Sequence, residues 1–506
     1  MPLCARKSNF LLFSRIDIIR CVIKPNHINL SDSWKICFWR GAVGQVSAVA
    51  APIDHLPLLR EAITDCSPKG IAAAVHRLIR AQKLNTGDRL PTVRELARAL
   101  AISPATVSEA WQVLGAVGAI QARGRAGSFV KETLEPGRPI RYLSIGGAPG
   151  VDGLDLSTGT PDPQLLPKLR EALERVTTRD LAWTTSYLDD PVLPQLEVIL
   201  RQNWPFEAQR VTVVDGALDA LSRVVEQTIR LGDRVIMENP GFPPLIDLLE
   251  RSGAEIIPVG MDDEGVRHAE VTLALEKSPV AIFIQPRAQN PTGTNMSKAR
   301  SVVLAEILRP TSILVIEDDH SGEIATGEDV SIGKFLPERT VHIRSYSKSH
   351  GPDLRIAAVG GSADVIDPLL SRRMLGPGWT SRLLQAVLIE LLTDKSAIAA
   401  VTRARSRYAV RSLALRAGLA GLGVTSSTGD GINAWVEVAD ERAALITLAA
   451  TGIRVAPGTP FEVVPTGVHH VRVTTGLLHE DDTEQWQHVI TALATAAKAG
   501  PTLRGV

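Results

Sequence analysis

From about residue 153 to 500, the chain alternates between short apolar segments and amphipathic stretches, and the apolar segments run into polar or glycine-rich residues. Short apolar runs predict buried strands, and the amphipathic stretches predict helices that cover them. This alternation is typical of an α/β domain in which several strands end at one edge of a sheet, where ligands bind. The clearest strand segments lie in "RVTVVDGALDALSRVVEQTI", "DRVIMENPGF", "AIFIQP", "SILVIEDD" and "TVHIRSYSK".

The size and composition of the chain predict a multidomain globular protein. Its 506 residues are too many for one ordinary domain, so two or three domains are expected. Hydrophobic residues at 44% and charged residues at 22% allow a large core to be buried. A net charge of zero argues against non-specific binding of polyanions by the whole molecule, although one domain can still be basic.

Cysteine usage and hydropathy predict a cytoplasmic protein. The cysteines are confined to positions 4, 21, 37 and 66, and no Cys or His cluster has the spacing of metal ligands. We therefore expect no disulfides and no metal site, as in a reducing compartment. No apolar run reaches the ~18 residues of a membrane span, and no signal peptide is evident.

Residues 1–52 differ from the rest of the chain. They contain three of the four cysteines and two of the eight tryptophans, without a steady helical or strand period. We expect either a disordered leader or an upstream-extended start of the reading frame. The alternative is a small subdomain.

Residues 53–132 predict a winged helix-turn-helix. Helical periodicity begins in "GIAAAVHRLIRAQKL", and "TVRELARAL" follows with Thr92 as its N-cap and Glu95 completing a capping box. "PATVSEAWQVLGAVG" is a third helix, capped by Ser103, and "AIQARGRAGSFV" predicts two short strands around a basic glycine-rich tip. Three helices followed by such a hairpin are typical of a winged DNA-binding domain.

Charge and motifs support DNA binding by this segment. Residues 70–132 contain nine Lys or Arg against four Asp or Glu, an excess suited to phosphate neutralisation. The stretches "GDRLPTVRELA", "SPATV" and "GRAGSFV" resemble the GntR family of bacterial regulators. Pro104 is a departure, because the family usually has an arginine there. The resemblance implies that double-stranded DNA is contacted by Arg94 at the backbone, by Ser103, Thr106 and Ser108 at the major groove, and by Arg123 and Arg125 in the wing.

Residues 133–152 are interrupted repeatedly by proline and glycine, and we expect an interdomain linker there. The domain that follows is expected over residues 153–500.

The strand ends of this domain carry a set of polar groups. Gly216 and Ala217 lie where a strand turns into a helix, and free N–H groups there favour a phosphate. The sequence "SYSKSHGPDLR" adds an amine, hydroxyls and a second cation. Each group alone has an ordinary structural explanation, such as a helix cap, a core aromatic or a solvated lysine. The other members of the set are Phe242, Asn290, Asp318, Ser345, Lys348 and Arg355.

The order of these groups resembles the fold-type I aminotransferases that use pyridoxal 5'-phosphate (PLP), over most of the last 350 residues. The resemblance implies that Lys348 forms a Schiff base with the PLP aldehyde and that Asp318 pairs with the pyridinium nitrogen. Asn290 would donate to the phenolate oxygen, and Phe242 would stack on the ring. The phosphate would be held by Ser345, Arg355 and the N–H groups at Gly216 and Ala217.

Two further roles follow from the same resemblance. Tyr187 would reach a phosphate in the neighbouring subunit, with a buried core tyrosine as the alternative. Arg472 would bind the α-carboxylate of an amino acid. His320 stands where the family has a tyrosine near the phenolate oxygen, and an imidazole can still donate a hydrogen bond there.

The combination resembles the MocR subfamily of GntR regulators, which implies a homodimer. We expect a transcription regulator that holds PLP as an internal aldimine and senses a small amine, an amino acid or PLP itself. The alternative is an active aminotransferase with an autoregulatory DNA-binding head, in which Lys348 is also the general base. The regulator is favoured because an intact DNA-binding head has little use on a housekeeping transaminase.

Overall fold

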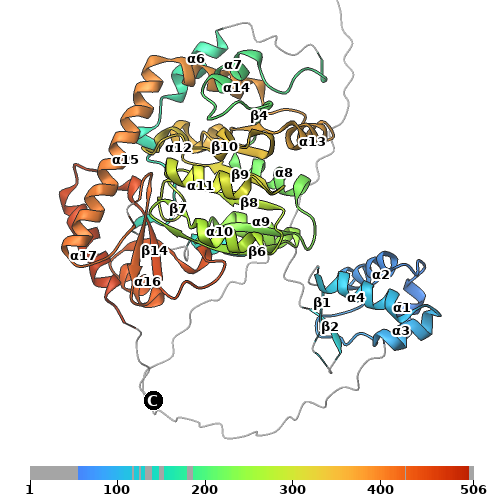
Figure 1. Ribbon diagram of the computed structural model, residues 1–506. Helices are drawn as coiled ribbons and strands as arrows, with labels where there is room; N and C mark the ends of the chain where they lie inside the picture. Colours follow the sequence, from blue (N-terminus) through green and yellow to red (C-terminus); the bar gives the residue numbers. More distant parts are fainter. Residues whose placement is uncertain are drawn as a thin grey trace, which may run out of the picture. The chain divides into compact units, whose positions relative to one another are not determined.

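The computed structural model describes residues 55–116, 119–122, 124, 127–131, 139–146, 153–178, 186–427 and 429–500 (Figure 1). The predictions for residues 1–52, for Arg123 and Arg125, and for much of 133–152 lie outside these ranges. Among the described helices, none is long and apolar enough to cross a membrane.

The N-terminal head is the expected winged helix-turn-helix. Its strands pair in antiparallel fashion, with Ile120 opposite Val130. A helix before the predicted three, α1, was not anticipated. The elements are α1 Leu56–Ala62, α2 Pro68–Arg80, α3 Val93–Leu100, α4 Pro104–Ala116, β1 Ile120–Ala122 and β2 Ser128–Val130.

Local sequence signals account for the helices of the head. The capping box of α3 is confirmed, because the Thr92 hydroxyl accepts from the Glu95 N–H (3.3 Å) and the Glu95 carboxylate accepts from the Thr92 N–H (2.8 Å). At α4, the Ser103 hydroxyl accepts from the Thr106 N–H at 3.2 Å. Buried Ile71, Val75 and Leu96 join these helices into one core, together with Val107, Ala110 and Leu114.

A short helix, α5 (Ile140–Ile145), lies within the segment expected to be a linker, and it packs on the large domain. The carboxylate of Asp247 in helix α9 (Pro243–Ser252) accepts from the backbone N–H groups of Arg141 (3.4 Å) and Tyr142 (3.1 Å). The Arg141 guanidinium also pairs with Glu250 at 3.0 Å. The described part of the connection, helix α5, is therefore anchored.

The large domain is built on an eight-stranded sheet with the order β4-β11-β10-β9-β8-β5-β6-β7. Strand β11 is antiparallel to both neighbours and β7 to β6, whereas the other pairs are parallel. The carboxyl ends of β4, β10, β9, β8 and β5 therefore share one edge. The strands are β4 Arg210–Val214, β5 Arg234–Asn239, β6 Glu255–Asp262, β7 Gly265–Val266, β8 Ala281–Ile284, β9 Leu314–Asp319, β10 Thr340–Ser345 and β11 Ala357–Gly361.

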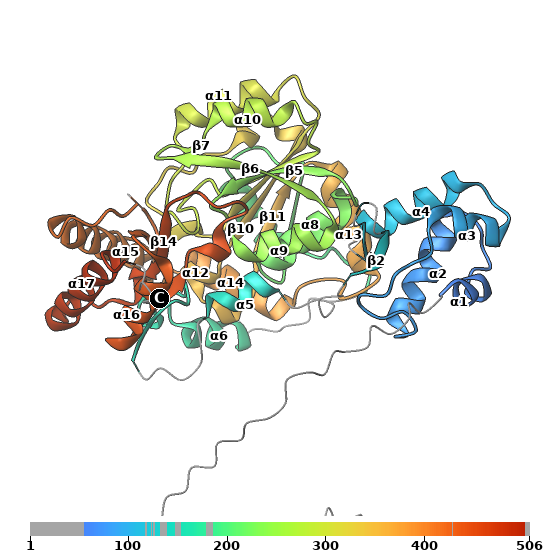
Figure 2. The same cartoon turned by 90° about the horizontal axis from the view of Figure 1, so that it is seen from below.

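Helices cover both faces of this sheet (Figure 2). Met237 and Phe283 pack toward α8, α9 and α13, whereas their neighbours Ile236 and Ile282 pack toward α10 and α11. This alternation is the period of two of strands buried on both sides. Helices α6, α7 and α14 pack on β4 and β11. They cover the same face of the sheet as α10 and α11, but at the opposite end of the strand order. The bounds are α6 Leu169–Thr177, α7 Pro194–Gln202, α8 Ala217–Thr228, α9 Pro243–Ser252, α10 His268–Leu275, α11 Lys298–Leu308, α13 Ala363–Met374 and α14 Arg382–Thr393.

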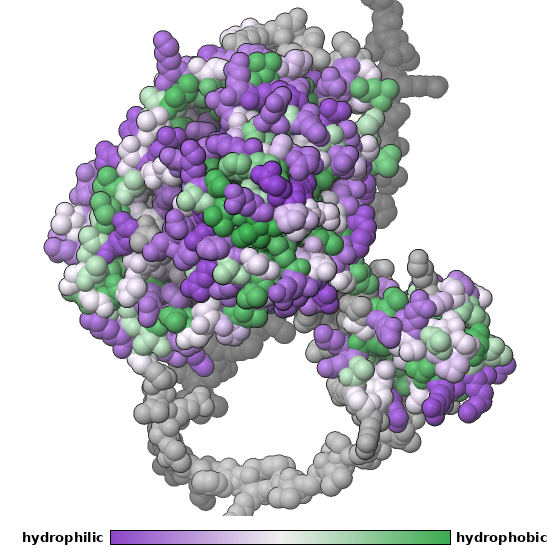
Figure 3. Space-filling model, in the orientation of Figure 1, coloured by the Kyte–Doolittle hydropathy of each residue, from purple (hydrophilic) through white to green (hydrophobic). Residues whose placement is uncertain are grey.

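The C-terminal part has its own sheet, with the order β12-β14-β13-β3 and a separate hydrophobic core. The long helix α15 leads into it from the large sheet. Its elements are β3 Leu154–Leu156, α15 Lys395–Gly421, β12 Asn433–Val438, α16 Glu441–Ala450, β13 Ile453–Pro457, β14 His469–Thr474 and α17 Thr483–Ala497. The visible face of the large domain is largely hydrophilic, with hydrophobic residues in scattered patches (Figure 3).

Candidate cofactor site at the sheet edge

Lys348 lies in the short helix α12 (Ser347–His350), directly after β10. Its Nζ contacts Nδ1 of His320, which follows β9. Nε2 of His320 lies 3.0 Å from the Ala288 carbonyl, which can only accept, so Nε2 carries the proton and Nδ1 accepts from the lysine. In this structure the imidazole thus accepts at Nδ1 and donates at Nε2, and donation to a phenolate oxygen of PLP stays a prediction.

Burial changes the protonation of this pair. Desolvation lowers the pKa of Lys348 to about 7, so the amine is largely neutral just above neutral pH. Desolvation, together with the lysine charge, holds the pKa of His320 well below its usual value. The lysine is therefore prepared to act as a nucleophile.

Asp318, at the end of β9, is buried and only half satisfied. Its Oδ2 accepts from Gln285 Nε2 at 2.6 Å, but its buried Oδ1 has no hydrogen-bond partner among the described residues. Desolvation raises the pKa of Asp318 to about 6, against the opposing effects of the Gln285 hydrogen bond and the Lys348 charge. A buried carboxylate oxygen of this kind needs a donor.

The next residue, Asp319, is fully partnered. Arg287 Nη2 lies 2.5 Å from its Oδ2, and Arg344 Nε lies 3.2 Å from the same atom. Burial alone would raise the pKa of Asp319, but Arg287, Arg344 and His342 hold it well below its usual value. Asp319, Asp329 and His342 bring potential metal-ligand atoms within 4.8 Å of one another, but arginines pair with both carboxylates.

A guanidinium and helix N–H groups lie close together where β4 meets α8. Gly216 has φ +100°, a conformation that favours glycine, and a Cβ there would lie 3.1 Å from Nη2 of Arg355. Arg355 donates to the Asp215 carbonyl at 3.3 Å. Ala217 begins α8, whose first N–H groups have no acceptor within the helix. The Ser345 hydroxyl accepts from the Ser347 N–H at 3.3 Å. Together these groups suit an anion.

A second cation approaches from the C-terminal sheet. Arg472 is only 3% exposed, donates to Asn290 Oδ1 (3.3 Å) and to the Ser157 carbonyl, and lies over the ring of Phe461. It has no acidic partner among the residues that the structure describes, and desolvation lowers its pKa to about 10. A buried guanidinium without a counter-ion favours a small anion.

The two predicted aromatic groups have different environments. Phe242 is the N-cap of α9 and packs, partly buried, beside Leu245 and Met237. Tyr187 is 88% exposed, and its ring lies 5.9 Å from that of Trp379. The alternative of a core tyrosine at position 187 is therefore wrong.

In the head, Arg94 on α3 is exposed. Ser103 is exposed too, and its hydroxyl lies 2.9 Å from that of Thr106. Thr106 and Ser108 are half-buried on the first turns of α4. The surface of α3 and of the N-terminal end of α4 thus holds four of the six predicted DNA contacts, whereas the two wing arginines are not described.

Sequence reasoning missed Gln285 and Glu238. Gln285 orients Asp318, and its own N–H donates to Glu238 at 2.9 Å. Desolvation raises the pKa of Glu238 to about 8, which favours its neutral form. Both residues lie at the carboxyl ends of parallel strands. Polar residues at such ends gather at one edge of the sheet, and this rule, which identified Asp318, identifies them as well.

Comparisons with known proteins agree with this architecture. Residues 151–490 match the family described as aminotransferase class I and II, and residues 68–130 match the bacterial regulatory proteins of the gntR family. The chain is 34% identical over 415 residues to the vitamin B6 salvage pathway transcriptional repressor PtsJ of Salmonella typhimurium, covering 81% of this chain and 94% of that protein. It is 27% identical over 445 residues to the HTH-type transcriptional regulator TauR of Rhodobacter capsulatus, covering 78% and 91%.

Solved structures share the fold of the large domain. Aspartate aminotransferase from Thermus thermophilus superposes with a TM-score of 0.61 at 23% identity, over 69% of this chain and 92% of that one. Kynurenine aminotransferase from Pyrococcus horikoshii gives 0.64 at 22% identity, over 73% and 98%. The chain therefore belongs to the gntR family of bacterial regulatory proteins, among the members in which the DNA-binding domain precedes an aminotransferase class I and II domain.

Proposed function

We propose that this protein is a DNA-binding transcription regulator whose aminotransferase-like domain binds PLP at Lys348. The observation that carries the proposal is the unpartnered, buried Oδ1 of Asp318, because the N–H of a pyridinium ring is the donor that this oxygen lacks. The proposal assigns DNA binding to residues 53–132, the connection to 133–152 and PLP binding to 153–500, the layout of the MocR subfamily.

The remaining site groups fit the rest of PLP. Ser345, Arg355 and the N–H groups at Gly216 and Ala217 would hold the phosphate, Asn290 would lie toward the phenolate oxygen, and Phe242 would flank the ring. When bound, PLP supplies an aldehyde for the lysine amine and an electron-withdrawing ring. Because Nδ1 of His320 faces the lysine, the neutral imidazole accepts a hydrogen bond from the amine and keeps Lys348 oriented.

We infer that vitamin B6 itself is the signal. The support is the similarity to PtsJ, which is named for repression of a vitamin B6 salvage pathway and matches over most of both chains. Occupancy of the Lys348 site would then change the affinity of the head for its operator. Such a switch requires that PLP bind the two states of the protein with different affinities.

A second candidate signal is a small amino acid. The support is Arg472, a buried guanidinium without an acidic partner in the described part of the chain, which donates to Asn290. An amino acid would place its carboxylate on Arg472 and its amine toward Lys348. Turnover with a keto acid would instead identify an aminotransferase that carries a DNA-binding head.

A homodimer is part of the proposal. Tyr187 and Leu188 are 88% and 79% exposed, unusual values for an aromatic and an aliphatic side chain. A partner subunit would cover them, and Tyr187 would then reach toward the partner's phosphate-binding groups. Sedimentation velocity of the full chain tests this, with Tyr187→Ala and Leu188→Ala expected to shift the equilibrium toward monomer.

The central experiment loads the full chain with PLP and removes the excess. We expect an absorbance band near the visible edge, which borohydride fixes to the peptide that contains Lys348. PLP-free and PLP-loaded samples are then compared in DNA-shift assays on the upstream region of the protein's own gene. Protein that retains no label at Lys348 after reduction would refute the proposal. Equal DNA affinities with and without PLP would refute the B6 signal alone, and a shift on adding amino acids would favour the second candidate.

A further inference from the structure

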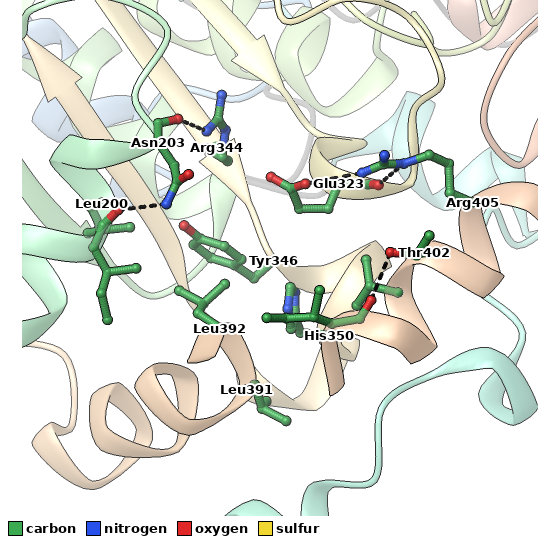
Figure 4. Close-up of a pocket in the computed structure, with 13 residues that line it drawn as sticks. Leu200, Asn203, Glu323, Arg344, Tyr346, His350, Leu391, Leu392, Thr402 and Arg405 are labelled. Atoms are coloured by element: carbon green, nitrogen blue, oxygen red, sulfur yellow. Dashed lines mark hydrogen bonds and ion pairs between the residues drawn. The ribbon is translucent and has the colours of Figure 1, made fainter. Parts of the chain in front are cut away.

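A cavity of about 220 Å³ lies beside α12, separate from the groups assigned to PLP (Figure 4). Helices α7, α14 and α15 form its apolar walls, with Leu200, Leu391 and Leu392 among the lining side chains. An engineered apolar cavity of ~150 Å³ is large enough for benzene. The space here therefore suits one ring with small substituents.

Two buried polar side chains that line the cavity can form further hydrogen bonds. Tyr346 and His350 are 4% and 5% exposed and line the cavity, and their ring centroids are 5.5 Å apart. Within the described ranges no group hydrogen-bonds to the Tyr346 hydroxyl, and the only partner of the His350 ring is the Ser349 hydroxyl, at Nδ1. Two buried groups thus offer hydrogen bonds to a molecule in the cavity.

The charged side chains among the described residues that line the cavity are paired. Arg344 donates to Asp319, Asp329 and the Asn203 carbonyl, so its nitrogens are engaged. Arg405 pairs with Glu323 at 3.2 Å. Burial lowers the pKa of His350 to about 4 and raises that of Tyr346, so both are neutral near pH 7. A charged ligand would be desolvated here without compensation.

We propose that this cavity is a binding site for a neutral molecule about one ring in size, with a hydroxyl or carbonyl group on an apolar body. Its polar group would hydrogen-bond to Tyr346 and His350, and its body would lie against the leucines of α7 and α14. The site is distinct from the PLP site, and its existence does not depend on PLP.

The position of the cavity also links it to Lys348. Tyr346 and His350 flank Lys348 in sequence, and α12 (Ser347–His350) is the element that carries the lysine. A molecule held by both flanking residues therefore contacts the two ends of the segment that orients the amine. We expect occupancy to change the environment of PLP attached to Lys348, and this second part rests on the proposed function.

The test uses two probes, 4-methylphenol and toluene, which differ in one hydroxyl. Binding to the PLP-loaded full chain is measured by titration calorimetry or ligand-observed NMR. Tyr346→Phe removes the hydrogen-bonding hydroxyl and should weaken 4-methylphenol about fivefold, while the affinity for toluene stays within about twofold. Leu392→Phe fills the cavity and should abolish binding of both probes. Leu383→Phe, on the same helix but away from the cavity, should leave both unchanged.

The outcomes separate the two proposals. A shift of the cofactor absorbance on adding 4-methylphenol, absent in Leu392→Phe, supports the link to Lys348. If the chain takes up no PLP but still binds 4-methylphenol in a Leu392-dependent way, the cavity site stands and the proposed function fails. Equal affinity for both probes, or affinity unaffected by Leu392→Phe, would overturn the cavity proposal.

Discussion

Two adjacent carboxylates at the end of β9 have opposite environments. Asp319 is neutralised by Arg287 and Arg344, whereas the Asp318 carboxylate has, among the described residues, one hydrogen bond to a side chain and one oxygen without a partner. The pKa of Asp318 is accordingly raised to about 6, and that of Asp319 is lowered. Successive side chains of a strand point to opposite faces of the sheet. The Asp319 carboxylate therefore pairs with the buried arginines, and the Asp318 carboxylate points toward the candidate site.

The lysine leads to the first prediction. In the PLP-free folded chain, acetylation of Lys348 by acetic anhydride should reach half of its plateau near pH 7, because the pKa is lowered to about 7 and the neutral amine reacts. In the urea-unfolded chain, the same lysine should continue to gain reactivity up to about pH 10. Peptide mass spectrometry measures both profiles. Identical profiles would contradict the assignment.

Asp318→Asn gives the second prediction. Loss of a charge-assisted hydrogen bond should weaken PLP retention at least about tenfold.

The same variant should also change how stability depends on pH. Since the folded-state pKa of Asp318 is raised to about 6, the buried group stabilises the fold best at low pH, and this contribution is lost as the pH rises through about 6. The PLP-free variant should therefore gain free energy of unfolding relative to the wild type at about pH 8 but not at about pH 4. Urea unfolding at the two pH values checks the sign, and equal differences would argue against a buried carboxylate.

At the scale of single elements, short-range signals define the helices of the head. Helix α3 is brief and exposed on one side, so its ends contribute much of its stability. The Thr92–Glu95 box satisfies two N–H groups that the helix leaves free. The same helix presents Arg94 to solvent.

The third prediction concerns this box. Thr92→Ala should cost about 1 kcal/mol and speed amide exchange of Val93–Leu100 about fivefold, because the helix end loses its cap. Hydrogen exchange with mass spectrometry of the full chain measures this locally. Glu109→Ala, an exposed substitution on α4, is the matched control and should leave α3 unchanged. Unchanged exchange in Thr92→Ala would show that packing alone holds α3.

At the scale of the whole molecule, the chain between the head and the large domain contains an anchored helix. Helix α5 is six residues long, too short to be stable alone. Asp247 accepts from two of its N–H groups, and Arg141 pairs with Glu250. Tertiary contacts therefore account for this helix in a stretch whose composition predicts a linker.

The fourth prediction is that Asp247→Ala releases α5. Amide exchange of residues 140–145 should rise at least about tenfold, because two N–H groups lose their acceptor. Exchange in the strands of the large sheet should not change, and Asp263→Ala, at an exposed acidic position, should have no effect on α5. If α5 stays protected in Asp247→Ala, the apolar contacts with α9 suffice to hold it.

Much of the architecture follows from local pattern. The strand segments of the large sheet, the capping box of α3 and the winged helix-turn-helix were predicted because periodicity and caps involve neighbours in sequence. Helices α1 and α5 were not predicted, since their stability depends on contacts with other segments. Asp318 and Lys348 could be identified because each lies at or just after the carboxyl end of a parallel strand, and such ends share one edge of the sheet.

The sequence by itself determined which chemical groups reach the edge of the sheet, because that depends only on where strands end. The tertiary structure decided which of these groups are buried, paired or shifted in pKa. Gln285 meets Asp318 across 33 residues and Arg472 meets Asn290 across 182, and such contacts determine which groups are buried, paired or left without a partner. Desolvation depends on everything packed around a group, so the lowered pKa of Lys348, the acceptor face of His320 and the cavity beside α12 emerge only from the folded chain.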